Sequence, residues 1–222
     1  MSKTLSGPML AAKSGKAERL VILLHGYGSD GNDMISLGSY WQNLLPNAMF
    51  IAPNAHEKCD INPMGHQWFV LDANSLTLEG SASRLEGSKQ ARPVIKDFLQ
   101  AVWKDTGLGA KDTILIGFSQ GAMMALEVGL RLDEELMGII AFSGGLPDPA
   151  NMKDEIKSKP PICFVHGSSD EVVPVKMSII SSEELKKLGL DVKFHISPNA
   201  GHTIAQDGLE FASEFIKELI ST

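Results

Sequence analysis

Cysteine is scarce in this chain of 222 residues, which contains only Cys59 and Cys163. Neither cysteine has a near neighbour of its kind, so the sequence shows no disulfide framework and no spacing typical of zinc ligands. Cys163 lies inside the apolar run 162–165. We therefore expect it to be a small buried core residue rather than a reactive thiol.

Long apolar runs and basic clusters are also missing. The longest strongly apolar runs, such as residues 20–24, have the length of a strand and fall far short of a membrane span, so we expect no stable membrane insertion. The first residues lack the apolar stretch of a signal peptide, which leads us to expect a cytoplasmic location. With a net charge of −7 and no basic cluster, the chain is not expected to bind nucleic acid.

The chain does contain a regular alternation of short apolar runs and longer helical patterns. Strands are predicted at residues 20–24, 49–52, 113–116, 138–142, 162–165 and 192–196, with a weaker edge strand at 8–12. Helices are predicted at residues 32–45, 84–103, 120–132, 176–188 and 204–220, and we expect Pro93 to kink or split the second of these. Near-continuous apolar strands are typical of buried parallel sheets. We therefore predict one α/β domain over residues 1–222, with a mostly parallel sheet of about seven strands, helices on both faces and no large lid domain.

One segment, residues 56–83, has neither a helical nor a strand period. We call it the excursion segment. Loops of this length in compact domains are usually functional or disordered, and its aromatic pair Trp68-Phe69, which looks exposed, argues against disorder. We expect this segment to pass over the functional site, the alternative being that it is packed surface.

The candidate nucleophile is Ser119, in the segment Gly117-Phe118-Ser119-Gln120-Gly121. The motif follows a predicted strand and precedes a predicted helix, which is the setting of a nucleophile elbow and predicts an α/β-hydrolase fold. Its two glycines remove side chains that would collide with the neighbouring strand and helix. The amino end of the helix also favours negative charge that develops during the reaction. The alternative is an ordinary glycine-rich turn around a capping serine.

A serine hydroxyl is a weak nucleophile near neutral pH and needs a base. In this fold the chain order is serine, acid, histidine, which favours His202 because it lies between the last predicted strand and the last helix. The remaining histidines lie in less suitable places, inside a strand, before a glycine at a strand end or in the excursion segment: His25, His56, His66, His166 and His195.

The candidate acid is Asp170, in a short loop just after the strand at 162–165. It would hold His202 in one tautomer and stabilise the imidazolium formed during attack. Two alternatives remain: Glu171, which is adjacent, and Asp148, which follows the preceding strand and looks like part of a turn.

An oxyanion hole needs two backbone N–H donors. We expect one from Gln120, after the nucleophile, and one from Tyr27, in the glycine-rich loop that follows the strand at 20–24. A phosphate-binding role for this loop is disfavoured, since the sequence contains neither the P-loop nor the dinucleotide-binding glycine pattern.

Four spaced blocks give the chain a specific resemblance. They are Leu24-His25-Gly26-Tyr27-Gly28, Gly117-Phe118-Ser119-Gln120-Gly121, His166-Gly167 with Asp170 and Val173-Pro174, and Gly201-His202. With these, the chain resembles the carboxylesterase/acyl-protein thioesterase (phospholipase–carboxylesterase) family of α/β-hydrolases along nearly its whole length.

The resemblance implies a triad of Ser119, Asp170 and His202, with Tyr27 and Gln120 as oxyanion donors. It also implies that Trp68, together with Phe69, borders the acyl pocket. Three positions depart from the family pattern: Tyr27 replaces the usual leucine, Thr203 follows the histidine where an acidic residue or serine is common, and His66-Gln67 precede Trp68. These departures concern substrate preference rather than the type of reaction.

We therefore expect a serine carboxylesterase that hydrolyses short- to medium-chain carboxylic esters through an acyl-enzyme. No metal or organic cofactor is implied, and the expected partner is a small-molecule ester. The alternatives are an acyl-protein or small-molecule thioesterase, or a lysophospholipase, using the same site. A non-catalytic hydrolase-like binding module is disfavoured because all three triad residues are present. A homodimer is compatible with the sequence.

Overall fold

The computed structural model describes residues 5–71 and 81–221. Its centre is a seven-stranded sheet with the strand order β1-β3-β2-β6-β7-β8-β9. All neighbouring strands are parallel except β1, which pairs antiparallel with β3 at the edge. The strands are β1 (Met9–Leu10), β2 (Arg19–Leu24), β3 (Ala48–Ile51), β6 (Thr113–Phe118), β7 (Gly138–Phe142), β8 (Ile162–Gly167) and β9 (Val192–Ser197). Every strand predicted from the sequence is confirmed, with bounds that differ by a few residues at most.

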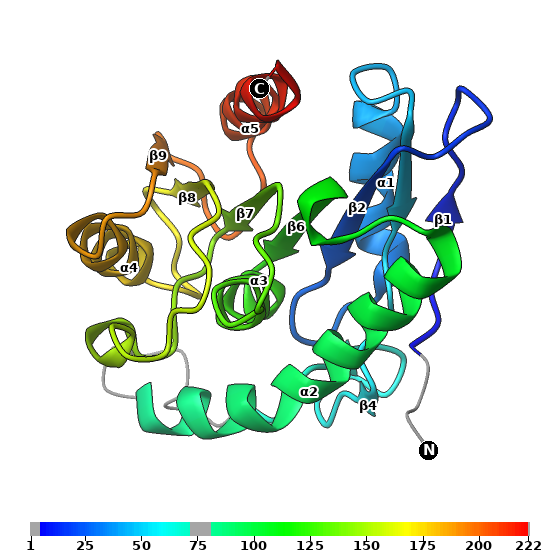
Figure 1. Cartoon of the computed structure of the whole chain (residues 1–222). Coiled ribbons are helices and arrows are strands. Elements are labelled where there is room, and N and C mark those ends of the chain that lie inside the picture. The colour runs from blue at the N-terminus through cyan, green and yellow to red at the C-terminus, as the bar shows by residue number, and fades with distance from the viewer. Residues whose placement is uncertain (1–4, 72–80, 222) are drawn as a thin grey trace.

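Helices cover both faces of the sheet, as predicted (Figure 1). One face carries α1 (Gly31–Trp41) and α5 (Gln206–Ser221), and the other carries α2 (Ser81–Thr106), α3 (Gln120–Gly129) and α4 (Val175–Lys187). The alternation of side chains along β2 shows the division, because Val21 and Leu23 belong to the core under α1 and α5, whereas Ile22 and Leu24 belong to the core under α2 and α3. Two short 3-10 helices, η1 (Ala110–Asp112) and η2 (Pro149–Asn151), complete the elements outside the excursion segment.

Helix α2 runs unbroken through Pro93, so the prediction of a split at this residue is wrong. Proline removes one backbone hydrogen bond and leaves the carbonyl four residues earlier without its helical partner. Both Pro93 and Lys89, which carries that carbonyl, are exposed. Water can therefore satisfy the freed group, while the buried residues Ile95 and Leu99 hold the helix against the core.

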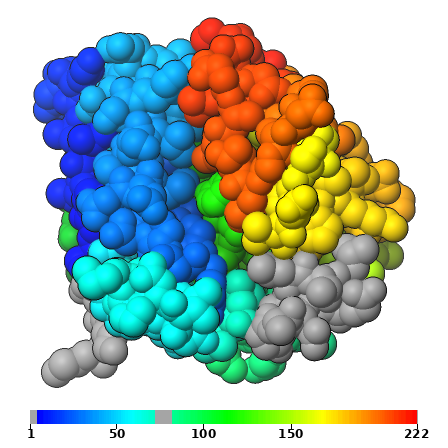
Figure 2. All heavy atoms as spheres, turned by 180° about the vertical axis from the view of Figure 1, so that it is seen from behind, coloured from blue at the N-terminus to red at the C-terminus, as the bar shows by residue number. Residues whose placement is uncertain are grey.

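The excursion segment contains a small antiparallel ribbon of β4 (Glu57–Lys58) and β5 (His66–Gln67). Strands of two residues are too short to produce a readable period, which explains why the sequence does not predict them. Trp68 and Phe69 are 0% and 4% exposed, so the expectation that they are exposed is wrong. In Figure 2 the cyan surface of this segment flanks a hollow with the green surface of the β6–α3 region at its base. Part of the excursion segment, residues 72–80, lies outside the described residues.

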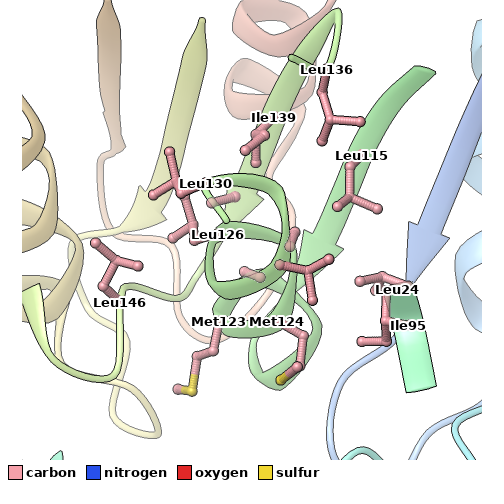
Figure 3. Close-up of a cluster of buried hydrophobic side chains, with 14 of the residues drawn as sticks. Leu24, Ile95, Leu115, Met123, Met124, Leu126, Leu130, Leu136, Ile139 and Leu146 are labelled. Atoms are coloured by element: carbon pink, nitrogen blue, oxygen red, sulfur yellow. The ribbon is translucent and has the colours of Figure 1, made fainter. Parts of the chain in front are cut away.

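Helix α3 is buried along its whole length. Figure 3 shows Met123, Met124 and Leu126 of this helix, and Leu130 just after it, in a cluster with residues of the sheet, of α2 and of the loops before and after β7: Leu24, Ile95, Leu115, Leu136, Ile139 and Leu146. Because the core surrounds α3, the turn that precedes it has a fixed position relative to the sheet. Among the described helices, none combines the length and apolar character that crossing a bilayer requires.

Candidate active site

Ser119 lies in the sharp turn between β6 and α3, with φ 54° and ψ −117°. A positive φ is strained for a residue with a side chain, and such strain is found at functional sites. Neither flanking glycine could carry a Cβ atom. A Cβ at Gly117 would lie 2.2 Å from Gly121 C, and a Cβ at Gly121 would lie 2.1 Å from Leu24 O. The backbone N–H of Ser119 donates to Phe142 O at 2.9 Å, which ties the turn to β7. The turn therefore has the geometry of a nucleophile elbow.

Ser119 opens into a groove of about 490 Å³ that also contains His202. In Figure 2 the hollow lies between the blue surface of the α1 region and the orange surface that follows β9. The groove is lined by Gly26, Tyr27, Ser29, Asp33, Met34, Ser36, Leu37, Phe118, Ser119, His202, Thr203 and Ile204. The ring of His202 packs against that of Phe118, with centroids 4.8 Å apart. A histidine and a strained serine therefore face the same cavity from loops that follow different strands.

Asp170 contacts His202 directly, with 2.7 Å between His202 Nδ1 and Asp170 Oδ2. Its other oxygen, Oδ1, accepts from the N–H groups of Val172 at 2.9 Å and Val173 at 2.8 Å. The carboxylate is 0% exposed. Because a carboxylate only accepts, Nδ1 of His202 carries the hydrogen and Nε2 is left as the basic nitrogen.

The two alternatives for the acid lie elsewhere. Glu171 is exposed, and Asp148 accepts a hydrogen bond from the Asn151 side chain at 2.8 Å, as expected for a turn residue. The structure therefore brings Asp170, rather than either alternative, to His202.

The loop that follows β2 forms the opposite wall of the groove. Gly26 approaches Ser119 so closely that an added Cβ would lie 3.4 Å from Ser119 Cβ. The side chain of Tyr27 points to Asp60, to which its hydroxyl donates. Burial and this hydrogen bond raise the pKa of Tyr27 above its usual range, so the phenol stays protonated. The backbone of Tyr27, rather than its hydroxyl, is thus the group of interest beside Ser119.

The excursion segment braces this loop. Asn62 Nδ2 donates to Gly28 O at 2.7 Å, and Gly28 N donates to His66 O at 2.9 Å. His66 N in turn donates to Ser29 O at 2.8 Å. These contacts hold the glycine-rich loop from outside, so the described part of the segment lies beside the groove rather than across it.

Gln120 links the excursion segment to the nucleophile turn through its buried side chain. Its Oε1 accepts from the Trp68 N–H at 3.0 Å, and its Nε2 donates to Phe69 O at 2.7 Å. The indole N–H of Trp68 then donates to His25 O at 2.9 Å. The sequence places Gln120 correctly after Ser119 but gives no sign of this clamp, because the bonded residues are 52 and 51 positions apart.

Trp68 and Phe69 do not line the groove at Ser119. Both line a separate cavity of about 300 Å³ together with residues of the excursion segment and of α2. The expectation that they border the pocket at Ser119 is therefore corrected. Their contacts with Gln120 and His25 instead place them beneath the loops that carry the proposed oxyanion donors.

The other histidines that the sequence placed at strand ends brace loops. His25 Nε2 accepts from Ala55 N at 2.9 Å, and burial lowers the pKa of His25, which keeps this nitrogen available as an acceptor. His166 contacts Asp170 instead, with 3.1 Å between its Nε2 and Asp170 Oδ2. His195, inside β9, pairs with Asp207 at 2.7 Å on the side of α5. Among the described residues, no group of three or more histidine, cysteine or acidic side chains is arranged to hold a metal ion.

Comparisons with known proteins agree with this geometry. A family model described as phospholipase/carboxylesterase matches residues 5–220. The esterase YpfH of Escherichia coli is 30% identical over 210 residues, which cover 92% of this chain and 84% of the relative. An acyl-protein thioesterase 1 of Neurospora crassa is 29% identical, covering 95% of this chain and 91% of the relative. The crystal structure of esterase PE8 superposes with a TM-score of 0.94 at 53% identity, covering 98% of this chain and 100% of that chain.

The matching model spans nearly the whole chain, and the relatives named as esterases and thioesterases align over most of their own length. The protein is therefore a serine hydrolase with the α/β-hydrolase fold and belongs to the phospholipase/carboxylesterase family.

Proposed function

We propose that the protein is a carboxylesterase that hydrolyses short- to medium-chain carboxylic esters through Ser119, His202 and Asp170. One observation carries this proposal: His202, held by Asp170 at 2.7 Å, faces the same groove as a serine in a strained elbow. A nucleophile, a base and a residue that orients the base are the minimum set for acyl transfer.

In this mechanism Ser119 Oγ attacks the ester carbonyl while His202 Nε2 takes the hydroxyl proton. The negative oxygen of the tetrahedral intermediate receives hydrogen bonds from the backbone N–H groups of Tyr27 and Gln120. His202 then gives its proton to the leaving alcohol, and an acyl-enzyme remains. Water repeats the sequence, since His202 takes a water proton and later returns it to Ser119. Asp170 stabilises the imidazolium in both halves.

The groove supports a small substrate. Its volume of about 490 Å³ lies within the usual range for sites that hold small molecules. Apolar contacts come from Met34, Leu37, Phe118 and Ile204, and polar ones from Ser29, Asp33, Ser36 and Thr203. A long acyl chain needs a continuous apolar lining, whereas this mixture of apolar and polar residues suits a short chain with a polar group beside it.

A second candidate activity is hydrolysis of acyl thioesters at the same site. It is favoured by the similarity over most of the chain to proteins named acyl-protein thioesterase 1. The same oxyanion donors and base serve a thioester, because its carbonyl is attacked in the same way and the leaving thiol needs less protonation.

The test is an activity profile with p-nitrophenyl esters of increasing acyl length and matched acyl thioesters. We expect the highest kcat/KM on short- to medium-chain esters and loss of several orders of magnitude in Ser119→Ala. Ser182→Ala is the matched control, because Ser182 is a buried serine on α4 outside the groove. A fluorophosphonate probe should label Ser119, as identified by mass spectrometry. Full esterase activity in Ser119→Ala would refute the proposal, and a preference for thioesters would favour the second candidate.

A further inference from the structure

His166 is a buried ionisable side chain that the proposed mechanism does not use. It lies near the end of β8, and its side chain is 0% exposed. Its Nε2 is 3.1 Å from Asp170 Oδ2, the oxygen that also binds His202. The same Nε2 is 2.9 Å from Val173 O. A second histidine, which does not line the groove, therefore contacts the proposed catalytic acid.

The other ring nitrogen of His166 belongs to a buried series of polar contacts. Its Nδ1 is 2.7 Å from Ser178 Oγ on α4, and Ser178 Oγ is 2.7 Å from Gly144 O in the loop after β7. Ser178 is fully buried. The ring is thus fixed at both nitrogens by groups from different elements of the fold.

The partners of His166 determine where its hydrogen lies. Nε2 faces a carboxylate and a carbonyl, neither of which can donate, so Nε2 must carry a hydrogen. This hydrogen is shared between Val173 O at 2.9 Å and Asp170 Oδ2 at 3.1 Å. At the other nitrogen, Ser178 Oγ donates its single hydrogen to Gly144 O, so Ser178 holds the ring by its position and does not select a tautomer.

Asp170 consequently accepts from the N–H groups of Val172 and Val173 on one oxygen and from His202 Nδ1 on the other. The hydrogen of His166 Nε2, which is shared with Val173 O, lies near the second oxygen as well. A carboxylate that accepts several hydrogen bonds is fixed in direction and has less negative potential left for each partner. Its direction decides where the ring of His202 points, and its residual potential decides how strongly the imidazolium is stabilised.

We propose that His166 is a positioning residue that orients Asp170 and limits the basicity of His202, with Ser178 holding its ring in place. The proposal rests on the function proposed above for Asp170 and His202. His166 touches neither the groove nor the substrate, so it acts only through the carboxylate.

The sign of the expected pH effect follows from these contacts. The ionisable groups that act on the His166 ring are Asp170 and His202, whereas α4 and the loop after β7 present only the Ser178 hydroxyl and the Gly144 carbonyl. Without the hydrogen bond from His166, more negative potential of Asp170 acts on His202. The imidazolium form of His202 is then favoured, and the acidic limb of the kcat/KM–pH profile moves to higher pH.

The experiment compares His166→Leu, which removes the donor, with His166→Gln, whose amide can place an N–H near the position of Nε2. Activity on a short-chain p-nitrophenyl ester is measured against pH and divided by the fraction of Ser119 that a fluorophosphonate labels. We expect His166→Leu to lower kcat about 10- to 100-fold, typical for loss of an outer hydrogen-bond partner. We also expect the acidic limb of the kcat/KM–pH profile to move to higher pH by about half a pH unit to one pH unit. His166→Gln should recover most of both effects.

The outcomes separate the two proposals. An acidic limb in His166→Leu that matches the wild type, with labelled Ser119 active, would overturn the role of His166 alone. Failure of the wild type to label at Ser119 would overturn the proposed function and this inference together. If His166→Leu does not fold, Ser178→Ala decides, because loss of the hydroxyl removes the contact that fixes the His166 ring beside Asp170. An acidic limb that lies at higher pH in Ser178→Ala than in the wild type supports the inference, and an acidic limb at the same pH as in the wild type overturns it.

Discussion

Replacing Asp170 by asparagine changes one atom at the centre of the proposed triad. The Val172 and Val173 N–H groups lie 2.9 and 2.8 Å from Oδ1, so the asparagine oxygen stays on that side. Its NH₂ group must then face His202 Nδ1, which the carboxylate contacts at 2.7 Å. Two donors cannot share one hydrogen bond, so His202 shifts its hydrogen to Nε2. In that tautomer Nε2 has no lone pair with which to take the proton of Ser119.

The expected loss is about 10⁴-fold in kcat, the size seen when a triad histidine is held in the wrong tautomer, or roughly 5 kcal/mol in the activation free energy. The backbone donors keep an acceptor and His166 Nε2 keeps Val173 O, so we expect Asp170→Asn to fold, as checked by its thermal unfolding curve. The assay is kcat on a short-chain p-nitrophenyl ester. Glu171→Gln is the matched control, because Glu171 is the adjacent and exposed carboxylate. A loss of less than about 10-fold in Asp170→Asn, or an equal loss in Glu171→Gln, would refute this reasoning.

Three further perturbations test the surroundings of the site. Gln120→Leu should lower the free energy of unfolding by about 2–6 kcal/mol in urea titrations, because it leaves a buried N–H and a buried carbonyl of the excursion segment unpaired; an unchanged midpoint would contradict the clamp. Glu127→Gln should lower the free energy of unfolding by about 3–5 kcal/mol, because the carboxylate of Glu127 is buried and lies 2.7 Å from Arg131 Nη1. The kcat per active site should be retained. An equal loss in the exposed Glu134→Gln would count against this assignment. Burial lowers the pKa values of His25 and His166 below 6.5, so as the pH falls these histidines bind protons in the unfolded chain before they do in the folded protein. The free energy of unfolding should therefore decrease below about pH 6.5, by up to about 1.4 kcal/mol per pH unit for each histidine. A urea midpoint that is flat between about pH 7.5 and 5 would contradict this expectation.

The sheet and the nucleophile turn could be predicted from the sequence because each has a local cause. Strands buried on both faces must be apolar at nearly every position, and this produces runs that differ visibly from the helices between them. The elbow needs glycines at fixed offsets, since a Cβ at Gly117 or Gly121 would meet backbone atoms at 2.2 or 2.1 Å. Both signals are contained in a few consecutive residues.

The environment of Trp68 could not be predicted in this way. An irregular segment has no period, so its sequence does not show which side chains turn inward. Trp68 can be buried because its backbone N–H donates to Gln120 Oε1 and its indole N–H donates to His25 O. These partners are 52 and 43 positions away in the sequence. The role of Ser178 beside His166 is hidden for the same reason, because a serine on a helix face gives no sign of the strand end that it contacts.

The order of the strands explains why the proposed base comes last in the chain. Ser119 follows β6 and Asp170 follows β8, with β7 between them. Two strand spacings separate these ends by roughly 10 Å, too far for a hydroxyl and a carboxylate to interact directly. An imidazole must bridge them, and it has to come from a loop that turns back over the sheet from β9. Backbone bonds tie this loop to the one that carries Asp170, with Ser169 N donating to Ala200 O at 2.9 Å.

The position of His202 between Ser119 and Asp170 depends on backbone and core contacts. The side chains that line the groove are therefore free to differ between relatives. The proposed oxyanion donors are backbone N–H groups, so the tyrosine at position 27 changes the wall of the groove without changing the donor. Thr203 and α1 residues such as Met34 and Leu37 also line the groove without bonding to the triad residues. Substrate preference can therefore diverge through these positions while the geometry of Ser119, Asp170 and His202 is held by the packing of α3 and by the loops after β8 and β9.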